Sequence, residues 1–169
     1  DNTFSNIKYF SKNGNEIGSL KSDSLGSISG FTGRKEDKSV FYSFTNFKQP
    51  AQFYKLNLLT GISELFWEES LSNFNANNYE TKLEFFPSKD GTLIPIHITH
   101  KKDLQIEPNT PVLLYGYGGF NISILPRFSK RYLAWMNQGG VFALANLRGG
   151  AEYGTVSNTH LTLPTSDLV

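Results

Sequence analysis

A glycine-rich segment between an apolar run and a helical pattern constrains the fold of this chain more than any other feature. The segment reads Tyr-Gly-Tyr-Gly-Gly-Phe-Asn over residues 115–121 and follows the apolar run 111–115. α/β enzymes bind substrates at strand-to-helix loops, and glycine lets the backbone approach a ligand closely. Two tyrosines and a phenylalanine in such a loop offer hydroxyl donors and flat apolar walls. The segment therefore indicates a binding pocket.

The residues on either side of the loop predict a parallel crossover. Large apolar side chains recur after Pro126 at spacings of three and four: Phe128, Tyr132, Trp135 and Met136. With Gly139-Gly140 as a stop signal, this pattern predicts an amphipathic helix that begins at the proline. The apolar runs 111–115 and 141–147 read as buried parallel strands. Strand, loop, helix and strand together predict one right-handed crossover of an α/β sheet.

The first third of the chain contains two hairpins of similar plan, in residues 7–20 and 52–67. Their turn glycines, Gly14 and Gly61, are 47 positions apart (61 − 14), and each follows the strand-turn-strand pattern of a hairpin. The run 39–47 supplies a further aromatic strand, so about four strands fall in each period, within the roughly 40 to 50 residues of a propeller blade. Two copies also fit a simple antiparallel sheet, and both readings stay open on this evidence.

The pattern changes near residue 78. Residues 73–78 are polar and asparagine-rich, which is typical of a linker. Two further strand runs, 79–86 and 92–100, flank a Pro-Ser-Lys-Asp-Gly turn and predict a third hairpin. An all-β part therefore gives way to an α/β part, and the predicted fold class is mixed.

Composition excludes several classes of partner. The 169 residues have 38% hydrophobic and 14% aromatic content, enough for a buried core, and a net charge of +1 without long basic runs. We therefore expect no nucleic-acid partner. Eighteen apolar residues never run together, and the start of the chain lacks a signal-peptide pattern, so we expect no membrane partner and a chain without its true beginning. The absence of cysteine excludes disulfides and thiolate chemistry.

Cofactor and metal motifs are incomplete. A dinucleotide fingerprint needs a third glycine where Asn121 stands, and an acidic residue about 20 positions on is missing. No Gly-Lys-Ser/Thr phosphate loop follows either, so we expect no cofactor. His97 and His100 are an odd number of positions apart on one predicted strand and face opposite sides, so they cannot share a metal ion. We expect no metal site, and we interpret both histidines as surface or edge residues; His160 carries no argument.

The polar residues after the second parallel run lie at the edge where such sheets bind ligands. Asn146 precedes Arg148-Gly149-Gly150 there. Arg148 either anchors a substrate carboxylate or braces the loop through backbone carbonyls, and we favour bracing. A serine hydrolase of the α/β type needs G-x-S-x-G. That pentapeptide is missing, and Ile28 occupies the nucleophile position in the nearest match, Gly26 to Gly30.

Several segments together closely resemble the prolyl oligopeptidase family. The segments that carry the resemblance are Leu114 to Ile124, Gly139-Gly140-Val141, Asn146 to Gly154, Phe86 to Thr92 with His100-Lys101-Lys102, and Gly26 to Phe31. The match covers residues 20–154 and is most specific over 84–154. The Gly-Gly-Phe-Asn form of the loop favours the proline-specific branch over relatives that cut after basic residues. Ala151 replaces a glycine that is usual in the family.

The resemblance implies a seven-bladed propeller that caps an α/β-hydrolase domain with a serine triad, which hydrolyses short peptides after proline. In this frame, residues 1–75 are the C-terminal blade or blades, residues 79–154 are the N-terminal part of the peptidase domain, and residues 155–169 form an unmatched tail. By resemblance Tyr117 stabilises the oxyanion with its hydroxyl, and Phe120 lines the pocket for the substrate proline ring. The family also implies a cytoplasmic monomer that acts on proline-containing peptides.

Two hypotheses about function follow. The first is a fragment of a serine-type oligopeptidase that is predicted to be inactive by itself, because the family's nucleophile, acid and base all lie downstream of anything present in this chain. On this view the tail reflects a truncated or wrongly joined reading frame. The alternative is a non-catalytic module that keeps the pocket loop and binds peptides or a partner.

Overall fold

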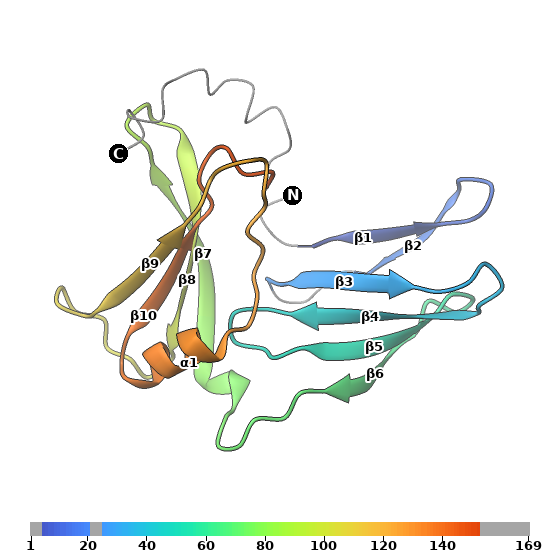
Figure 1. Cartoon of the computed structure of the whole chain (residues 1–169), viewed down its shortest axis with the longest axis horizontal. Helices are drawn as coiled ribbons and strands as arrows, with labels where there is room; N and C mark the ends of the chain where they lie inside the picture. The colour runs from blue at the N-terminus through green and yellow to red at the C-terminus, as the bar shows by residue number, and fades with distance from the viewer. Residues whose placement is uncertain (1–4, 21–24, 153–169) are drawn as a thin grey trace.

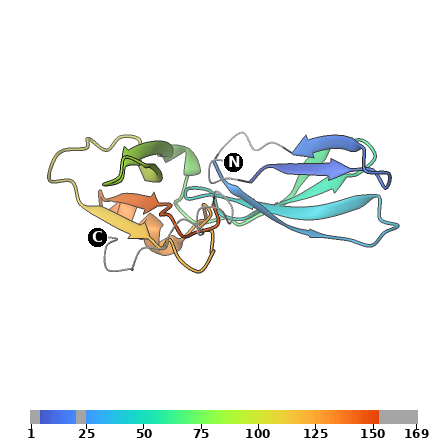
Figure 2. The same cartoon turned by 90° about the horizontal axis from the view of Figure 1, so that it is seen from above.

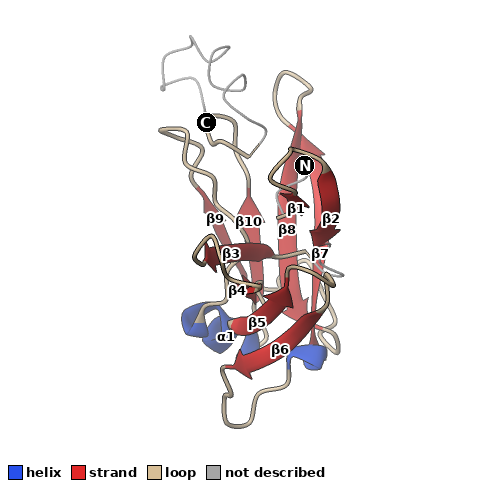
Figure 3. Ribbon diagram, turned by 90° about the vertical axis from the view of Figure 1, so that its right-hand side faces the viewer, coloured by secondary structure: helices blue, strands red, loops and turns tan. Residues whose placement is uncertain are grey.

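The computed structural model describes residues 5–20 and 25–152 (Figure 1). The elements, in chain order, are β1 (Ile7–Phe10), β2 (Glu16–Leu20), β3 (Ser27–Thr32), β4 (Ser39–Thr45), β5 (Gln52–Asn57), β6 (Ser63–Glu68), the 3-10 turn η1 (Ala76–Asn78), β7 (Tyr79–Pro87), β8 (Leu93–Lys101), β9 (Val112–Gly116), α1 (Lys130–Asn137) and β10 (Val141–Ala145). The tail 155–169, with His160, lies outside the described residues. In the described part the strands form three sheets, and strands far outweigh helix (Figure 3).

The four strands β3 to β6 form one antiparallel meander in sequence order. Its central strands β4 and β5 are rich in aromatic side chains, which favour strands. Tyr42 on β4 stacks on Phe31 of β3 at 5.4 Å and on Tyr54 of β5 at 5.2 Å between ring centroids. Gly61, at φ +71°, makes the turn between β5 and β6. The predicted hairpin in residues 52–67 is confirmed.

The hairpin of β1 and β2 forms its own two-stranded sheet and does not join the meander. Its turn glycine, Gly14, has φ +82°, as the predicted hairpin requires. The hairpin packs against the turn of the last hairpin of the meander, because a Cβ built on Gly61 would lie 2.6 Å from Tyr9 Oη. Repeated hairpins that pack side by side in separate sheets are the arrangement of adjacent propeller blades.

The second large sheet has the strand order β7-β8-β10-β9. β7 and β8 pair over their full lengths as the predicted third hairpin, and β10 runs antiparallel to β8 and parallel to β9. The prediction that the runs 111–115 and 141–147 are parallel neighbours is therefore confirmed. The two large sheets lie at opposite ends of an elongated molecule (Figure 2).

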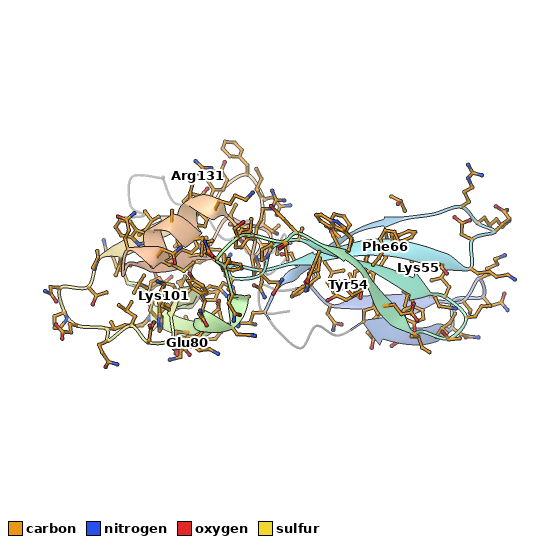
Figure 4. The ribbon with its side chains drawn as sticks, turned by 90° about the horizontal axis from the view of Figure 1, so that it is seen from below. Tyr54, Lys55, Phe66, Glu80, Lys101 and Arg131 are labelled. Carbon is orange, nitrogen blue, oxygen red and sulfur yellow. The ribbon has the colours of Figure 1, made fainter. Side chains whose placement is uncertain are left out.

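Side chains cover both ends of this elongated molecule (Figure 4). Tyr54, Lys55 and Phe66 lie on the meander end, and Glu80 and Lys101 lie on the other. Glu80 Oε1 on β7 lies 3.5 Å from His100 Nε2 on β8.

One buried cluster joins the two ends. Its members are Phe47, Tyr79, Met136, Phe142 and Leu144, each at most 4% exposed. Phe142 stacks on Tyr132 of α1 with ring centroids 3.9 Å apart, and Phe47 packs against Phe142 at 5.6 Å. Phe47 follows β4 of the meander, whereas the other members belong to the second sheet and its helix. Burial of this phenylalanine therefore fixes the meander to the second sheet.

The helix begins later than predicted. α1 begins at Lys130 after Ser129, which has extended backbone angles, and not at Pro126. The residues in between are held by the meander: Ser27 Oγ donates to the Pro126 carbonyl at 2.7 Å, and the Phe128 N–H donates to Thr45 Oγ1 at 3.3 Å. The bond from Ser27 engages the Pro126 carbonyl, which a helix that begins at the proline would use as an acceptor, so tertiary contacts override the proline start signal.

β9 is exposed and not buried as predicted. All five residues of β9 are exposed, because β9 lies at the edge of the sheet. The exposed fraction is 38% for Leu113 and 63% for Leu114. Its parallel neighbour β10 is buried along its whole length, as predicted. An apolar run by itself does not distinguish an edge strand from a central one.

The interpretation of the histidines as surface or edge residues is wrong. His97 is 0% and His100 4% exposed, because β8 is a central strand between β7 and β10. The regular register of β8 on β7 keeps the two side chains on opposite faces. His97 packs at 5.3 Å from the ring of Phe47, and His100 Nδ1 lies 2.8 Å from the Lys101 carbonyl oxygen.

Burial of His97 predicts a loss of stability in mild acid. Desolvation lowers its pKa from 6.5 to about 4, so the folded state favours the neutral ring. The stabilisation is complete above pH 6.5 and is lost as the pH falls toward 4, because the unfolded chain then binds more protons. From pH 6.5 to pH 5 the free energy of unfolding should fall by about 2 kcal/mol.

Urea titrations of the protein at pH 7 and pH 5 measure this change. His97→Gln, which cannot be protonated, should show a clearly smaller difference between the two pH values. Asp90, whose pKa is lowered to about 2, does not interfere, since its contribution is lost only below its ordinary value of 3.8. An unchanged pH dependence in the variant would contradict the assignment to His97.

Candidate active-site loop

The loop that contains Tyr117 follows β9 at the carboxyl edge of the parallel pair. β9 ends at Gly116, which is in register with Ala145 at the end of β10. The segments that follow, residues 116–124 and 146–152, therefore leave the sheet side by side. In open α/β sheets this edge is where ligands bind. We call residues 116–124 the Tyr117 loop and residues 146–152 the supporting segment.

The two segments touch through their backbones. Gly118 has φ +61°, and a Cβ there would lie 2.6 Å from both the Arg148 carbonyl oxygen and Leu147 Cβ. The Asn121 N–H donates to the Gly149 carbonyl at 3.2 Å. Only glycine at position 118 permits this approach, since it needs neither space for a side chain nor a negative φ.

Gly118→Ala should therefore lower the free energy of unfolding by about 1–3 kcal/mol, because it adds both a clash and a strained backbone. Gly119→Ala is the matched control. At Gly119 a Cβ would meet only the Tyr117 ring, at an ordinary 3.7 Å, and φ is not positive. Urea denaturation of both variants measures the difference, and equal losses would contradict the close packing of the Tyr117 loop.

The structure places the two predicted site residues on the outer side of this loop. Tyr117 is 43% and Phe120 90% exposed. Phe120 has φ +51° and its neighbour Asn121 φ +56°, left-handed backbone that is uncommon outside glycine and often found at functional sites. Among the described residues the Tyr117 hydroxyl has no hydrogen-bond partner. Both side chains are thus accessible to a ligand or to another part of a larger protein.

A cavity of about 590 Å³ lies beside this region, between the meander and the segment that leads into α1. It is lined by Tyr115, Phe128 and Tyr132 among others, together with Ser27 and Thr45 of the meander. Tyr117 and Phe120 do not line it. The structure therefore does not bring the two predicted site residues together into this cavity.

Arg148 braces the supporting segment, as favoured, but through side chains and not through backbone carbonyls. Its guanidinium pairs with the Asp90 carboxylate and contacts Ser88 Oγ at 3.3 Å. A hydrogen bond from the Thr92 backbone and the Arg148 contact lower the pKa of Asp90 to about 2. The turn between β7 and β8 is thereby tied to the supporting segment, and Arg148 is engaged in this contact.

Sequence reasoning missed the roles of Asn146 and Glu152. Asn146 is 4% exposed, and its Nδ2 donates to the Ile124 carbonyl at 2.9 Å and to Glu152 Oε1 at 3.0 Å. The same Glu152 oxygen accepts the Ile124 N–H at 2.9 Å. A Cβ on Gly150 would overlap the Glu152 carboxylate. The sequence signal for this contact is a pair of polar residues, Asn146 and Glu152, on either side of Gly149-Gly150 and directly after the buried strand β10.

Within 5–20 and 25–152, no three or more histidine, aspartate or glutamate side chains gather in a way that would hold a metal ion. In the same part of the chain, no helix combines the length and the apolarity that crossing a bilayer requires.

Comparisons with known proteins agree with this architecture. A family model described as the N-terminal β-propeller domain of prolyl oligopeptidase matches residues 1–69. Prolyl endopeptidase of Elizabethkingia meningoseptica is 43% identical over 148 residues, which cover 88% of this chain and 21% of that protein. Prolyl endopeptidase of Dictyostelium discoideum is 36% identical over 151 residues, with 88% of this chain and 20% of that protein covered.

Solved structures give the same result. A chain from a structural study of two prolyl endopeptidases superposes with a TM-score of 0.88 at 37% identity, and covers 94% of this chain and 23% of its own. Prolyl oligopeptidase B from Galerina marginata, bound to a 25mer macrocyclization substrate, gives a TM-score of 0.86 at 26% identity, over 94% of this chain and 22% of its own.

The sheet-rich fold and these matches place the chain in the class of proteins that have an N-terminal β-propeller domain. It belongs to the prolyl oligopeptidase family. The chain spans about one fifth of the length of the curated relatives that it matches.

Proposed function

We propose that this chain is part of a serine-type oligopeptidase that hydrolyses short peptides after proline. The observation that carries the proposal is the Tyr117 loop, which is docked at the carboxyl edge of the parallel strands and presents Tyr117 and Phe120 outward. In this proposal the Tyr117 hydroxyl donates to the oxyanion of the tetrahedral intermediate, and Phe120 forms an apolar wall for the proline ring.

The rigidity of the loop supports the proposed role of Tyr117. An oxyanion donor is effective when it is already in place before charge develops, because no reorganisation is then needed. Close backbone packing at Gly118 and the bond from Asn121 to Gly149 hold the loop on the sheet. The Tyr117 hydroxyl has no hydrogen bond to the described residues, which leaves it as a donor for a ligand oxygen. A flat ring such as that of Phe120 suits the apolar side of proline.

The second sheet supports the assignment of residues 79–154 to the first part of an α/β-hydrolase domain, and of residues 1–75 to the end of a propeller. The antiparallel hairpin β7–β8 is followed by the parallel strands β9 and β10, and the helix α1 lies between these two strands in the chain. The exposed edge of β9 offers unpaired backbone groups to a further strand. We also propose a cytoplasmic monomer with proline-containing peptides as substrates, as in the family that the chain resembles.

The chain by itself should be catalytically inert, since the family's nucleophile, acid and base lie downstream of the matched residues. The purified 169-residue chain is expected to leave a proline-containing chromogenic peptide uncleaved and to remain unlabelled by a serine-directed phosphonate. The full-length protein, assayed in parallel, should cleave the peptide after proline and take up the label. Label on the short chain, or a full-length protein that cleaves after lysine or arginine instead, would overturn the proposal.

A further inference from the structure

The far end of the Tyr117 loop is held by side chains and not by a sheet ladder. Ile124 has both of its backbone groups engaged: its N–H donates to Glu152 Oε1 at 2.9 Å, and its carbonyl accepts from Asn146 Nδ2 at 2.9 Å. The Asn146 amide also donates to the same Glu152 oxygen at 3.0 Å. One carboxylate oxygen thus receives two N–H groups and closes a three-membered network of hydrogen bonds.

One member of this network is buried, and the other two are partly buried. Asn146 is buried, and the Glu152 carboxylate occupies the space above Gly150 that a side chain at that position would fill. Two N–H groups that donate to one carboxylate oxygen hold that oxygen in place from two directions. The bond donated by the Asn146 amide fixes the rotamer of the carboxylate that receives the Ile124 N–H.

This network helps to set the position of the Tyr117 side chain. Its hydroxyl has no hydrogen bond to the described residues, so its position is set by the backbone of its loop. That backbone is held at its start by the pairing of β9 with β10, in its middle by Gly118 and Asn121, and at its end by Ile124. Loss of the hydrogen bond between Ile124 and Glu152 lets the end of the Tyr117 loop shift away from the supporting segment.

We infer that Glu152, together with Asn146, is a positioning residue for the Tyr117 hydroxyl. The inference rests on the proposed function, because it concerns the alignment of the oxyanion donor. A reacting group that is misplaced by about 1 Å can lose about 10²-fold in rate even when the mutation is distant from the chemistry. Glu152 Oε1 is engaged by Ile124 and Asn146, and it acts on the hydroxyl only through the backbone of the Tyr117 loop.

The test is a double-mutant cycle in the full-length protein, with kcat and KM for a proline-containing peptide as readouts. Glu152→Ala should lower kcat by about 10- to 100-fold with little change in KM. Glu152→Gln keeps an acceptor oxygen for Ile124 and should recover most of that loss. Glu107→Ala, which removes an exposed carboxylate on the loop between β8 and β9, is the matched control and should leave kcat unchanged.

The decisive measurement adds Tyr117→Phe. If Glu152 acts through the tyrosine hydroxyl, Glu152→Ala causes no further loss in the Tyr117→Phe background, whereas a merely structural role gives the same fold-loss in both backgrounds. Additive losses, or no loss from Glu152→Ala, overturn the inference while the proposed function stands. Should Glu152→Ala fail to fold, the same cycle with Glu152→Asp decides, because the shorter side chain withdraws the acceptor oxygen from the Ile124 N–H. A wild-type protein that does not cleave the peptide, or a fully active Tyr117→Phe variant, overturns the proposed function and this inference with it.

Discussion

Tyr117→Phe in the full-length protein is expected to lower kcat for a proline-containing peptide by about 10²- to 10³-fold, or about 3–4 kcal/mol of transition-state stabilisation. The substitution removes one hydroxyl and keeps the ring, so the change reports the lost donor. Charge on the oxyanion exists only in the transition state and the intermediate. The loss should therefore appear in kcat, with KM nearly unchanged.

Tyr115→Phe is the matched control for this prediction. Tyr115 lies two residues upstream at the end of β9, is similarly exposed at 42%, and loses the same atom. Its side chain lines the cavity beside α1 and not the outer side of the Tyr117 loop. Steady-state kinetics on both variants measure the contrast. Equal losses in the two variants would contradict an oxyanion role that is specific to Tyr117.

Phe142→Ala is expected to lower the free energy of unfolding by about 3–5 kcal/mol. Phe142 is 1% exposed and stands at the centre of the cluster that joins the meander to the second sheet. Truncation removes its stacking on Tyr132 and its contact with Phe47, and leaves a cavity that β10, hydrogen-bonded on both sides, cannot collapse to fill. The loss is large because transfer and cavity costs add.

Equilibrium urea unfolding of the protein measures this loss. Phe142→Leu keeps most of the buried volume and should lose less than half as much. Because the same cluster fixes the meander to the second sheet, Phe142→Ala should also increase proteolysis in the linker 73–78. A loss below about 1 kcal/mol would contradict the central position of this ring.

Local signals predicted the hairpins well, since each depends on a turn that the sequence itself specifies. Gly14, Gly61 and Gly91 all have φ between +71° and +82°, and each stands in the turn of a predicted hairpin. The parallel pair was also predictable, because two apolar runs that flank a glycine loop and a helix pattern have few other arrangements. The helix was predicted, but its first turn was not, because contacts from the meander claim the residues after Pro126.

The sequence by itself determined the family, the hairpins and the position of the Tyr117 loop between two parallel strands. These depend on turn residues, periodicity and a specific run of glycines and aromatics, all of which act over short distances along the chain. Only the tertiary structure decided that His97 is buried, that β9 is an edge strand, and that Glu152 and Asn146 hold Ile124. Burial and hydrogen-bond partners depend on which segments meet in space, and residues 124 and 152 meet only because β9 and β10 end at the same edge of one sheet.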